Sequence, residues 1–302
     1  MLLKKWNLSF VDYKSKVEKL SRQVLNEREK RIHPGLDDKT LLSWNALMIN
    51  AYLDAYDAFG EKKWYNIAAG TIAFISKKMT KDDGGLFHNY KNSRATINAF
   101  LEDYSFFIHA LIRMYQVSFE IDYLEKARDL TIYSIENFAE ADHALFYFSS
   151  IKDAPLIVRN KEVQDNVIPA SNSQMAIILY FLGNYFEIKE WITRSELMLI
   201  NMKNHLQGYG SGYSNWLLLW MYNSYPLKEL VICGMNAVQI REQIFKAPVP
   251  PGLISAGAIS VETLPMTQGR LTSDKTFMYV CKDHSCHLPV HTVEEAFGIL
   301  NQ

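Results

Sequence analysis

Residues 44–79, WNALMINAYLDAYDAFGEKKWYNIAAGTIAFISKKM, contain two helical patterns of different character joined by a short break. The first pattern is apolar nearly all round, which is typical of a helix that is buried on every side. The second has one apolar stripe at helical spacing, marked by Trp64, Ile72 and Met79, so its opposite face is expected to lie in water. This segment therefore predicts an inner helix paired with an outer helix.

The same arrangement occurs again at 104–139 and at 173–206. An aromatic residue begins the second helix of each unit, and these residues, 59 and 68 positions apart, are Trp64, Tyr123 and Trp191. An open α-solenoid also stacks helix pairs, but its repeats usually span about 33–47 residues. The longer periods favour a mainly α fold of the α/α toroid type, like that of six-hairpin glycosidases, in which inner helices ring a central cavity.

Two further helical patterns accompany the three pairs, one at about 9–31 and an inner-type helix at about 211–225. Eight helices in all are fewer than the twelve of a closed toroid of six pairs, so the toroid is expected to be incomplete in this chain. After Pro226 the pattern changes to a small α/β appendage. The sequence thus predicts a helical toroid over 1–226 and the appendage over 227–302.

The expected elements of the appendage follow from short β-branched and amphipathic segments. A loop with the sequence PVPPGLISAG separates them. The segments are the strands 228–234 and 276–281 and the helices 236–246 and 293–300.

Composition excludes several classes of partner. The 302 residues carry a formal net charge of −1, which argues against nucleic acid or an anionic membrane as a partner. The first residues lack the apolar stretch of a signal peptide, and no run approaches the roughly 20 apolar residues of a membrane span. Three cysteines in so long a chain favour a reducing compartment, and we expect a soluble cytoplasmic protein.

Polar clusters mark the expected starts of the four inner helices. In a toroid these helix ends meet at one mouth of the cavity, so a ring of carboxylates, amides and hydroxyls is predicted there. Simple capping is the alternative, because Asp, Asn and Ser stabilise helix starts. The clusters are Asp37–Asp38 with Lys39, Glu102–Asp103, Ser171–Asn172–Ser173, and Ser211 with Ser214–Asn215.

Carbohydrate hydrolysis would need two carboxyl groups, one acid and one base or nucleophile, about 5–5.5 Å apart for retention or about 6.5–9.5 Å for inversion. Asp38 and Glu102 are the candidate catalytic pair, since each begins an inner helix. The candidate substrate-binding residues around them are Asp37, Lys39, Trp44, Asn45, His88, Arg94, Asp103, Tyr104, Asn172, Ser173 and Trp216.

Several of these residues have a second interpretation. Trp44, Tyr104 and Trp216 would stack on a sugar ring or simply fill the core. His88 lies on the expected loop GGLFHNYKNSR (84–94) and would serve as a general base or be solvated. Arg94, on the same loop, would bind an anionic substituent or pair with a neighbouring acid.

The cysteines leave three alternatives. Cys281 and Cys286, with histidines nearby and Cys233 as a third ligand, would bind a metal, form a disulfide or redox pair, or stay reduced. A second pair of cysteines is missing, so we expect no metal. No nucleotide-binding or other cofactor motif is present in the sequence, and we expect no cofactor.

Four segments carry a family resemblance, namely LDDKTLLSWNALMI (36–49), FLEDYSFFIHAL (100–111), IPASNSQMA (168–176) and YVCKDHSCHLPV (279–290). In these segments the chain resembles the C-terminal helical region of the spermatogenesis-associated protein 20 family. The resemblance implies a six-hairpin toroid that follows a thioredoxin-like domain, which this chain lacks. It does not imply a reaction.

Two functions are therefore expected. One is a carbohydrate-active domain, similar to glycosidases or sugar epimerases, with a sugar or small-molecule ligand at the mouth. The other is a non-catalytic binding module for the attached thioredoxin-like domain. An apolar edge left by the missing helices would favour a homodimer.

Overall fold

The computed structural model describes residues 9–272 and 275–301, and the chain forms two compact units, residues 1–39 and 40–302. The first unit contains helix α2 (Phe10–Glu29), where the lone helix was expected. The Ser9 hydroxyl oxygen begins this helix by accepting a hydrogen bond from the Asp12 N–H at 3.1 Å. In the described part of the chain, none of the helices combines the length and the apolar character that crossing a membrane requires.

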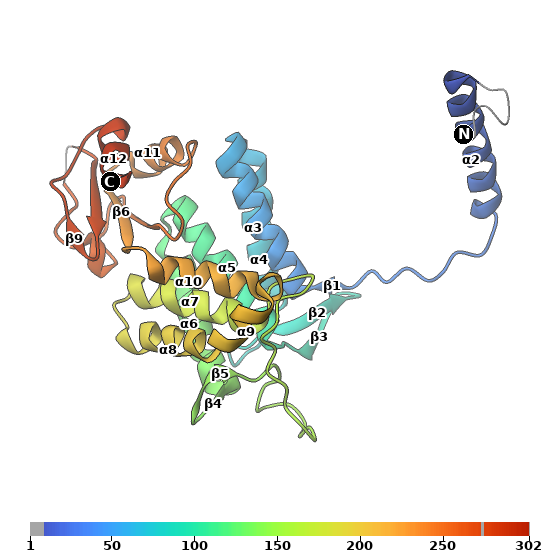
Figure 1. Ribbon diagram of the computed structural model, residues 1–302, viewed down its shortest axis with the longest axis horizontal. Coiled ribbons are helices and arrows are strands. Elements are labelled where there is room, and N and C mark those ends of the chain that lie inside the picture. Colours follow the sequence, from blue (N-terminus) through green and yellow to red (C-terminus); the bar gives the residue numbers. More distant parts are fainter. Residues whose placement is uncertain (1–8, 273–274, 302) are drawn as a thin grey trace. The chain divides into compact units, whose positions relative to one another are not determined.

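The second unit is built from helical hairpins (Figure 1). Helix α3 packs on α5, α5 on α7 and α7 on α10, so these four form the inner layer. Nearly every residue of α5 and α7 is buried, whereas α4 and α6 bury one face. The hairpins are α3 (Leu42–Phe59) with α4 (Lys62–Lys78), α5 (Leu101–Ser118) with α6 (Ile121–Phe138), and α7 (Ser171–Tyr185) with α8 (Lys189–Asn201), followed by α9 (Lys203–Gly208) and α10 (Ser214–Ser224).

The fold is mainly α and is an incomplete α/α toroid, as predicted. Among the described residues the inner layer has four helices, where a closed ring of six pairs has six. The first and last inner helices expose large apolar side chains, which are Trp44, Met48 and Phe59 on α3 and Leu218 and Trp220 on α10. The homodimer suggested by such an edge stays a prediction.

Short antiparallel strands connect the hairpins, and here one expectation is wrong. The segment GGLFHNYKNSR was expected to be a loop, but most of it forms a β-hairpin. Its turn residues Asn92 and Ser93 both have positive φ, as a two-residue hairpin turn requires, although the usual Asn-Gly signal is missing. The strands are β1 (Thr40–Leu41), β2 (Phe87–Lys91) and β3 (Arg94–Asn98) in one sheet, and β4 (Ala139–Glu140) and β5 (His143–Phe146) in another.

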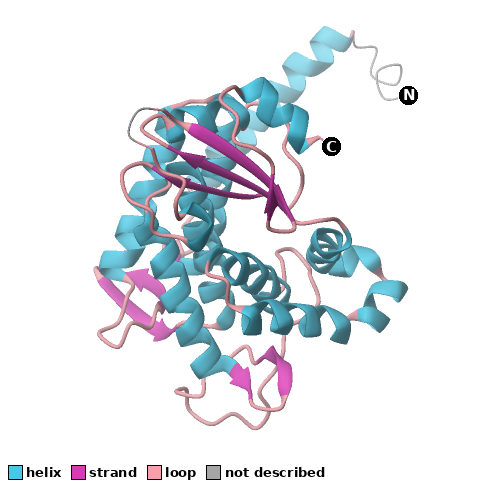
Figure 2. Cartoon of the chain, turned by 90° about the vertical axis from the view of Figure 1, so that its left-hand side faces the viewer, coloured by secondary structure: helices cyan, strands magenta, loops and turns pink. Residues whose placement is uncertain are grey.

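The C-terminal part contains a β-sheet, drawn in magenta near the C-terminus in Figure 2. Its four strands follow the order β7-β6-β8-β9, with β6 and β7 parallel and the other pairs antiparallel. The expected strands and helices are present. The prediction of a loop over PVPPGLISAG is wrong at the end of that segment, because β7 begins there. The small residues of β7 lack the alternating pattern of a strand, and all five residues of β7 are buried. The elements are β6 (Lys228–Cys233), α11 (Ala237–Ile244), β7 (Ile254–Ala258), β8 (Phe277–Lys282), β9 (Ser285–Cys286) and α12 (Val293–Leu300).

Strand β7 lies against the ends of two inner helices. The Tyr185 hydroxyl, at the end of α7, donates to the Ser255 carbonyl at 2.8 Å. A Cβ atom on Gly257 would come within 2.3 Å of the Phe119 ring at the end of α5, so only glycine fits there. The sheet is thereby held against the toroid.

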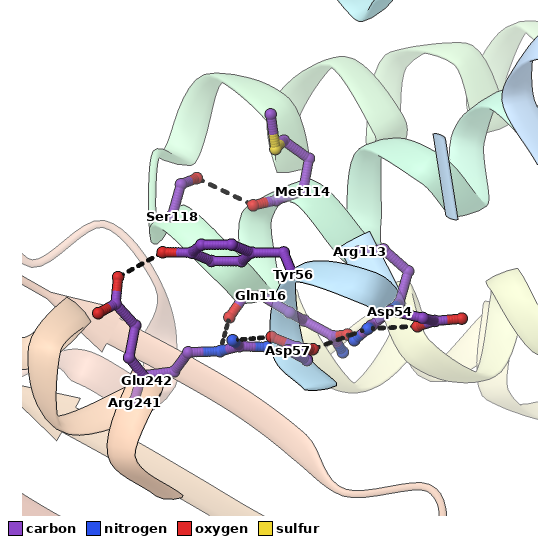
Figure 3. A network of polar contacts seen from close by, with 9 residues as sticks. All are labelled: Asp54, Tyr56, Asp57, Arg113, Met114, Gln116, Ser118, Arg241 and Glu242. Atoms are coloured by element: carbon purple, nitrogen blue, oxygen red, sulfur yellow. Dashed lines mark hydrogen bonds and ion pairs between the residues drawn. The ribbon is translucent and has the colours of Figure 1, made fainter. Parts of the chain in front are cut away.

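Helix α11 docks on α3 and α5 through a buried polar network (Figure 3). Arg241 is 1% exposed; its guanidinium donates to both oxygens of Asp57, and its Nε donates to the Gln116 carbonyl at 2.9 Å. Asp57 also accepts from Arg113 at 3.1 Å. These contacts join the helical hairpins to the C-terminal part, and the predicted domain boundary at residue 226 stays a prediction.

Candidate functional site

The amino-terminal ends of α3 and α5 lie together, with β2 beside them. The Ser43 N–H donates to Asp103 Oδ1 at 3.0 Å, and the Ser43 hydroxyl donates to Glu102 Oε1 at 3.4 Å. His88 Nδ1 lies 2.9 Å from Asp103 Oδ2. Two helices and a strand thus bring a carboxylate pair and an imidazole into one cluster.

Asp103 acts as a cap and as a support for His88. Its side chain is fully buried and accepts the backbone N–H groups of Ser43 and Phe100, the latter at 2.9 Å. Burial raises the pKa of Asp103, and the hydrogen bonds from His88, Phe100 and Ser43 oppose that rise. The ionised carboxylate only accepts, so in that state Asp103 holds His88 with the proton on Nδ1. Capping therefore explains this acid, and its further effect is to orient the imidazole ring.

Glu102 is the carboxylic acid of this cluster that capping does not explain. Burial, followed by the negative charges of Asp103 and Glu162, raises the pKa of Glu102 to about 7, against the opposing effects of His88 and Ser43. A carboxyl group with such a pKa both holds and releases a proton at neutral pH, as a general acid or base must.

Among the residues that the structure describes, the same three residues form a group that could hold a cation. One ligand atom from each of His88, Glu102 and Asp103 lies within 4.8 Å of the others. Both Asp103 oxygens already accept backbone N–H groups, however, and His88 Nδ1 is bonded to Asp103. The geometry therefore suits proton transfer better than metal binding.

The polar ring continues onto α7 and α10 through an acid that the sequence analysis missed. Asp165 is buried and accepts the Ala170 N–H at 2.8 Å, the Ser173 hydroxyl at 2.7 Å and the Asn215 N–H at 2.8 Å. Ala170 has no side chain with which to cap α7. An apolar residue at a helix start was the available signal that a distant acceptor caps this helix.

Glu162 and Asn172 hold the same helix start. The Glu162 carboxylate accepts the Ser171 N–H at 3.0 Å. The Asn172 amide accepts the Phe146 N–H at 2.7 Å and donates to the carbonyls of Phe146 and Glu162, each at 2.9 Å. Asn172 and Ser173 therefore serve the fold at this point.

A cavity of about 360 Å³ lies among the four inner helices and the segment 249–253. Its volume falls in the range of small-molecule sites, about 300–1,000 Å³. Burial, and then the charge of Arg113, lowers the pKa of His109 to about 4, so its imidazole is neutral at pH 7. The polar residues that line the cavity are Asn50, Asp54, His109, Arg113, Gln116, Gln174, Asn215 and Tyr222.

The cavity and the Glu102 cluster share one face of α5. His109 and Arg113 follow Glu102 by seven and eleven positions, which places each of them within about 20° of Glu102 around the helix. The rise of an α-helix puts His109 about 10 Å further along than Glu102. On α3, Ser43 and Asn50 have the same spacing. These polar residues lie on one face of helices that are otherwise apolar.

Two cavity residues carry buried polar atoms without a partner. Within residues 9–272 and 275–301, Oδ1 of Asn50 and Nε2 of Gln174 are buried and lack a hydrogen-bond partner. An unpaired buried polar atom costs about 1–3 kcal/mol, so it is seldom retained without a use. A hydroxyl-bearing ligand in the cavity would offer both a donor and an acceptor.

Some predicted site residues lie outside this unit. Asp37, Asp38 and Lys39 belong to the first unit, where Lys39 Nζ lies 3.2 Å from Asp37 Oδ2. The suggested catalytic pair of Asp38 and Glu102 stays a prediction.

The aromatic candidates differ from one another. Tyr104 and Trp216 are fully buried; the Tyr104 hydroxyl accepts the Leu86 N–H at 2.8 Å, and Trp216 Nε1 donates to the Val163 carbonyl at 2.8 Å. The prediction that either ring stacks on a sugar is wrong, because neither ring has a face exposed to solvent. Trp44 is 62% exposed, so the core interpretation is wrong for it and its stacking role stays a prediction.

The other two candidates lie on the periphery. The Asn45 side chain donates to the Leu41 carbonyl at 2.7 Å, a contact within its own helix start. Arg94 is exposed at the first position of β3. Neither observation supports a ligand-binding role for the residue concerned.

Cys281 and Cys286 form a disulfide, so the expectation of reduced cysteines is wrong for this pair. Cys233 is buried as a free thiol, and burial raises its pKa to about 11.

The raised pKa of Glu102 predicts a pH-dependent stability. Glu102 ionises near pH 7 in the fold but near its ordinary value of 4.5 when unfolded, so unfolding releases a proton in this window and stability falls as pH rises. At pH 8, Glu102→Gln should be more stable than the parent by about 1–2 kcal/mol, a value reduced for solvent screening. Near pH 4 the two should be equal.

Urea unfolding at both pH values measures this difference. Glu136→Gln, at an exposed position on α6, is the matched control and should change stability little at either pH. A Glu102→Gln variant that is no more stable than the parent at pH 8 would contradict the raised pKa.

Comparisons with known proteins agree with this fold. No family model matches the chain. A GH76 α-mannanase of Bacteroides thetaiotaomicron superimposes with a TM-score of 0.51 and 12% identity, over 71% of this chain and 59% of the mannanase. At this identity the similarity shows the fold alone.

Curated relatives extend the comparison to sequence. Human spermatogenesis-associated protein 20 is 25% identical over 293 residues, which cover 89% of this chain and 37% of that protein. The rat protein is 23% identical over 93% of this chain and 38% of its own length. The chain thus spans less than two fifths of the curated relatives that it matches. The expected resemblance to the spermatogenesis-associated protein 20 family is therefore confirmed, and it extends over about nine-tenths of this chain.

Proposed function

We propose that residues 40–302 form the ligand cavity and the acid–base cluster of a carbohydrate-active toroid, similar to a glycosidase or a sugar epimerase. The observation that carries this proposal is the cavity of about 360 Å³, into whose walls all four inner helices place polar residues. Amide groups such as those of Asn50 and Gln174 both donate and accept, as the hydroxyl groups of a sugar require.

The acid–base cluster supports a chemical role for the same face. Glu102, with a pKa of about 7, would donate a proton to a leaving oxygen or return it to a carbon. Hydrolysis needs a second carboxylate. Glu162 is one candidate, because its charge raises the pKa of Glu102, and Asp38 is the other. Epimerisation needs a base, for which the oriented His88 is suited.

The mannanase fold adds a scaffold on which one carbohydrate enzyme is built, and a fold by itself does not determine a reaction. The proposal therefore depends on the cavity and its residues.

Gln174→Leu tests the proposal with two opposite effects. Removing the unpaired buried amide should leave the free protein equally stable, or more stable by up to about 1–2 kcal/mol. The same change should abolish the thermal shift produced by a bound sugar. A panel of neutral, aminated and acidic mono- and disaccharides is screened, where a ligand at a hundredfold excess over its Kd stabilises the parent by about 2.7 kcal/mol.

Gln207→Leu, at an exposed position on α9, is the matched control and should keep the full ligand shift. A Gln174→Leu variant that still responds to a sugar would move the site away from the cavity. If the parent responds to no sugar, the carbohydrate proposal is overturned.

A non-catalytic binding module is the second candidate. It is favoured by the polar residues that serve as caps, since Asp103, Asp165 and Asn172 all use their side chains to hold helix starts. A thioredoxin-like domain is the partner suggested by the family resemblance. Binding of a separately produced thioredoxin-like domain, together with silence toward every sugar, would favour this candidate.

A further inference from the structure

A disulfide crosses the β8–β9 hairpin far from the cavity residues in the sequence. Cys281 and Cys286 are directly opposite one another on the two strands. The turn between them is formed by Asp283 and His284, both with positive φ. Such a two-residue turn sets the two cysteines side by side before any bond forms between their sulfurs.

The two sulfurs have unequal surroundings. Cys286 is exposed, whereas Cys281 is 1% exposed. One guanidinium nitrogen of Arg270 lies 3.2 Å from Cys286 Sγ, and another lies 3.7 Å from Cys281 Sγ. An incoming thiolate would therefore reach Cys286, and a positive charge is in place for the sulfur anions that reduction produces.

Arg270 is held in this position from two sides. The Glu262 carboxylate accepts the backbone N–H groups of Gly269, Arg270 and Leu271 at 2.8, 2.8 and 2.6 Å. The guanidinium carbon lies 4.9 Å from the centre of the Tyr279 ring. These contacts hold the Arg270 guanidinium next to the sulfurs, whereas an arginine without such contacts would move freely in solvent.

The hairpin has supports that do not need the disulfide. Asp283 and Leu227 exchange two hydrogen bonds, each of 2.9 Å, one of them through the Asp283 carboxylate. His284 Nδ1 lies 3.0 Å from Glu229 Oε1. The crosslink closes a very short loop, so its entropic contribution is smaller than that of a crosslink between distant residues. Reduction should therefore leave the two thiols facing each other and ready to pair again.

We propose that Cys281 and Cys286 form a reversible thiol–disulfide exchange site whose substrates are dithiols, with Arg270 as the residue that activates Cys286. A thiolate of the dithiol attacks Cys286 Sγ, the bond between Cys281 and Cys286 breaks, and Cys281 leaves as a thiolate that takes up a proton. The second thiol of the dithiol then displaces Cys286 and forms the new disulfide. Two electrons and two protons pass from the dithiol to the protein.

The chain carries an internal reference for this proposal. Cys233 is buried as a free thiol whose pKa burial raises to about 11, so it should not react while the protein is folded. Any thiol that dithiothreitol exposes in the native chain should therefore come from the hairpin alone.

The test uses the full chain, dithiothreitol as the dithiol, and alkylation by iodoacetamide read by mass spectrometry. After reduction the native protein should gain a label at the exposed Cys286 and none at the buried Cys233. When the alkylation rate of Cys286 is measured as a function of pH, the midpoint of the profile should lie below about 8.5, the pKa of a free cysteine. Arg270→Gln should lower that rate at pH 7 by about five- to tenfold, because less thiolate is present.

Lys282→Gln is the matched control, since it removes a positive charge from the same hairpin at an exposed position, and it should keep the parent rate within about twofold. Circular dichroism of each variant checks that the fold is retained. A disulfide that resists dithiothreitol until the protein unfolds would overturn the proposal. So would a Cys286 alkylation profile that is ordinary in the parent and unchanged in Arg270→Gln.

Discussion

Replacing Arg241 by methionine should lower the free energy of unfolding by about 3–4 kcal/mol. Removing one partner of a buried ion pair costs about 3–5 kcal/mol because the other charge stays buried. The lower part of this range is expected, since Asp57 keeps its contact with Arg113 at 3.1 Å. The contact of the guanidinium with the Phe245 ring, at 3.9 Å, is lost as well.

Urea unfolding followed by circular dichroism measures this loss. Arg128→Met is the control, because Arg128 pairs with Asp129 on the exposed face of α6 and such pairs contribute about 0–1 kcal/mol. Adding Asp57→Asn to Arg241→Met removes the buried charge and should recover part of the loss. Equal losses for Arg241→Met and Arg128→Met would show that α11 does not depend on this network.

Asp165→Ala should cost about 3 kcal/mol and loosen the starts of two inner helices together. The change removes the acceptor for the Ala170 and Asn215 N–H groups and for the Ser173 hydroxyl. Hydrogen bonds to a charged group contribute about 1.5–3 kcal/mol each, and three that share one carboxylate add up to less than their sum. Asp165→Asn keeps one carbonyl oxygen and should lose about half as much.

Unfolding free energies of the two variants check this order, and hydrogen exchange should rise in α7 and α10 together. The control is Asp122→Ala, in the first turn of α6, where only the interaction with the helix dipole, about 0.3–1 kcal/mol, is lost. A rise in exchange confined to α7 would mean that Asp165 does not link the two helices.

The helical hairpins were predictable because their signal is periodic and repeated. The single apolar stripe of α4 predicts an outer helix, and the apolar character of α7 predicts an inner helix. Both predictions need only the local sequence. Strand β7 was not predictable, because Ile-Ser-Ala-Gly-Ala has neither a period of two nor β-branched residues beyond its first position. Its position depends on packing of Gly257 against Phe119, which lies far away in the sequence.

The candidate site divides in the same way. Glu102, Asp103 and His88 were found from residue type and from the expected meeting of helix starts. Asn50, His109 and Gln174 were missed, because single polar residues within apolar helices carry no local motif. Their use becomes clear only when four helices surround a cavity.

The spacing of 59 residues that relates the first two hairpins also relates polar residues of their inner helices, pairing Ser43 with Glu102, Asn50 with His109, Asp54 with Arg113 and Asp57 with Gln116. Equivalent places in two copies of one motif thus hold different chemical groups. Ser43 bonds to Glu102, and Arg113 bonds to Asp54 at 2.9 Å, so each contact joins a residue to its own counterpart. Two identical copies would place the same group on both sides of each contact, with Asp opposite Asp or Arg opposite Arg at the second of them. A symmetrised chain, with either hairpin duplicated, would therefore keep its outer layer and lose the bonds that join its inner helices.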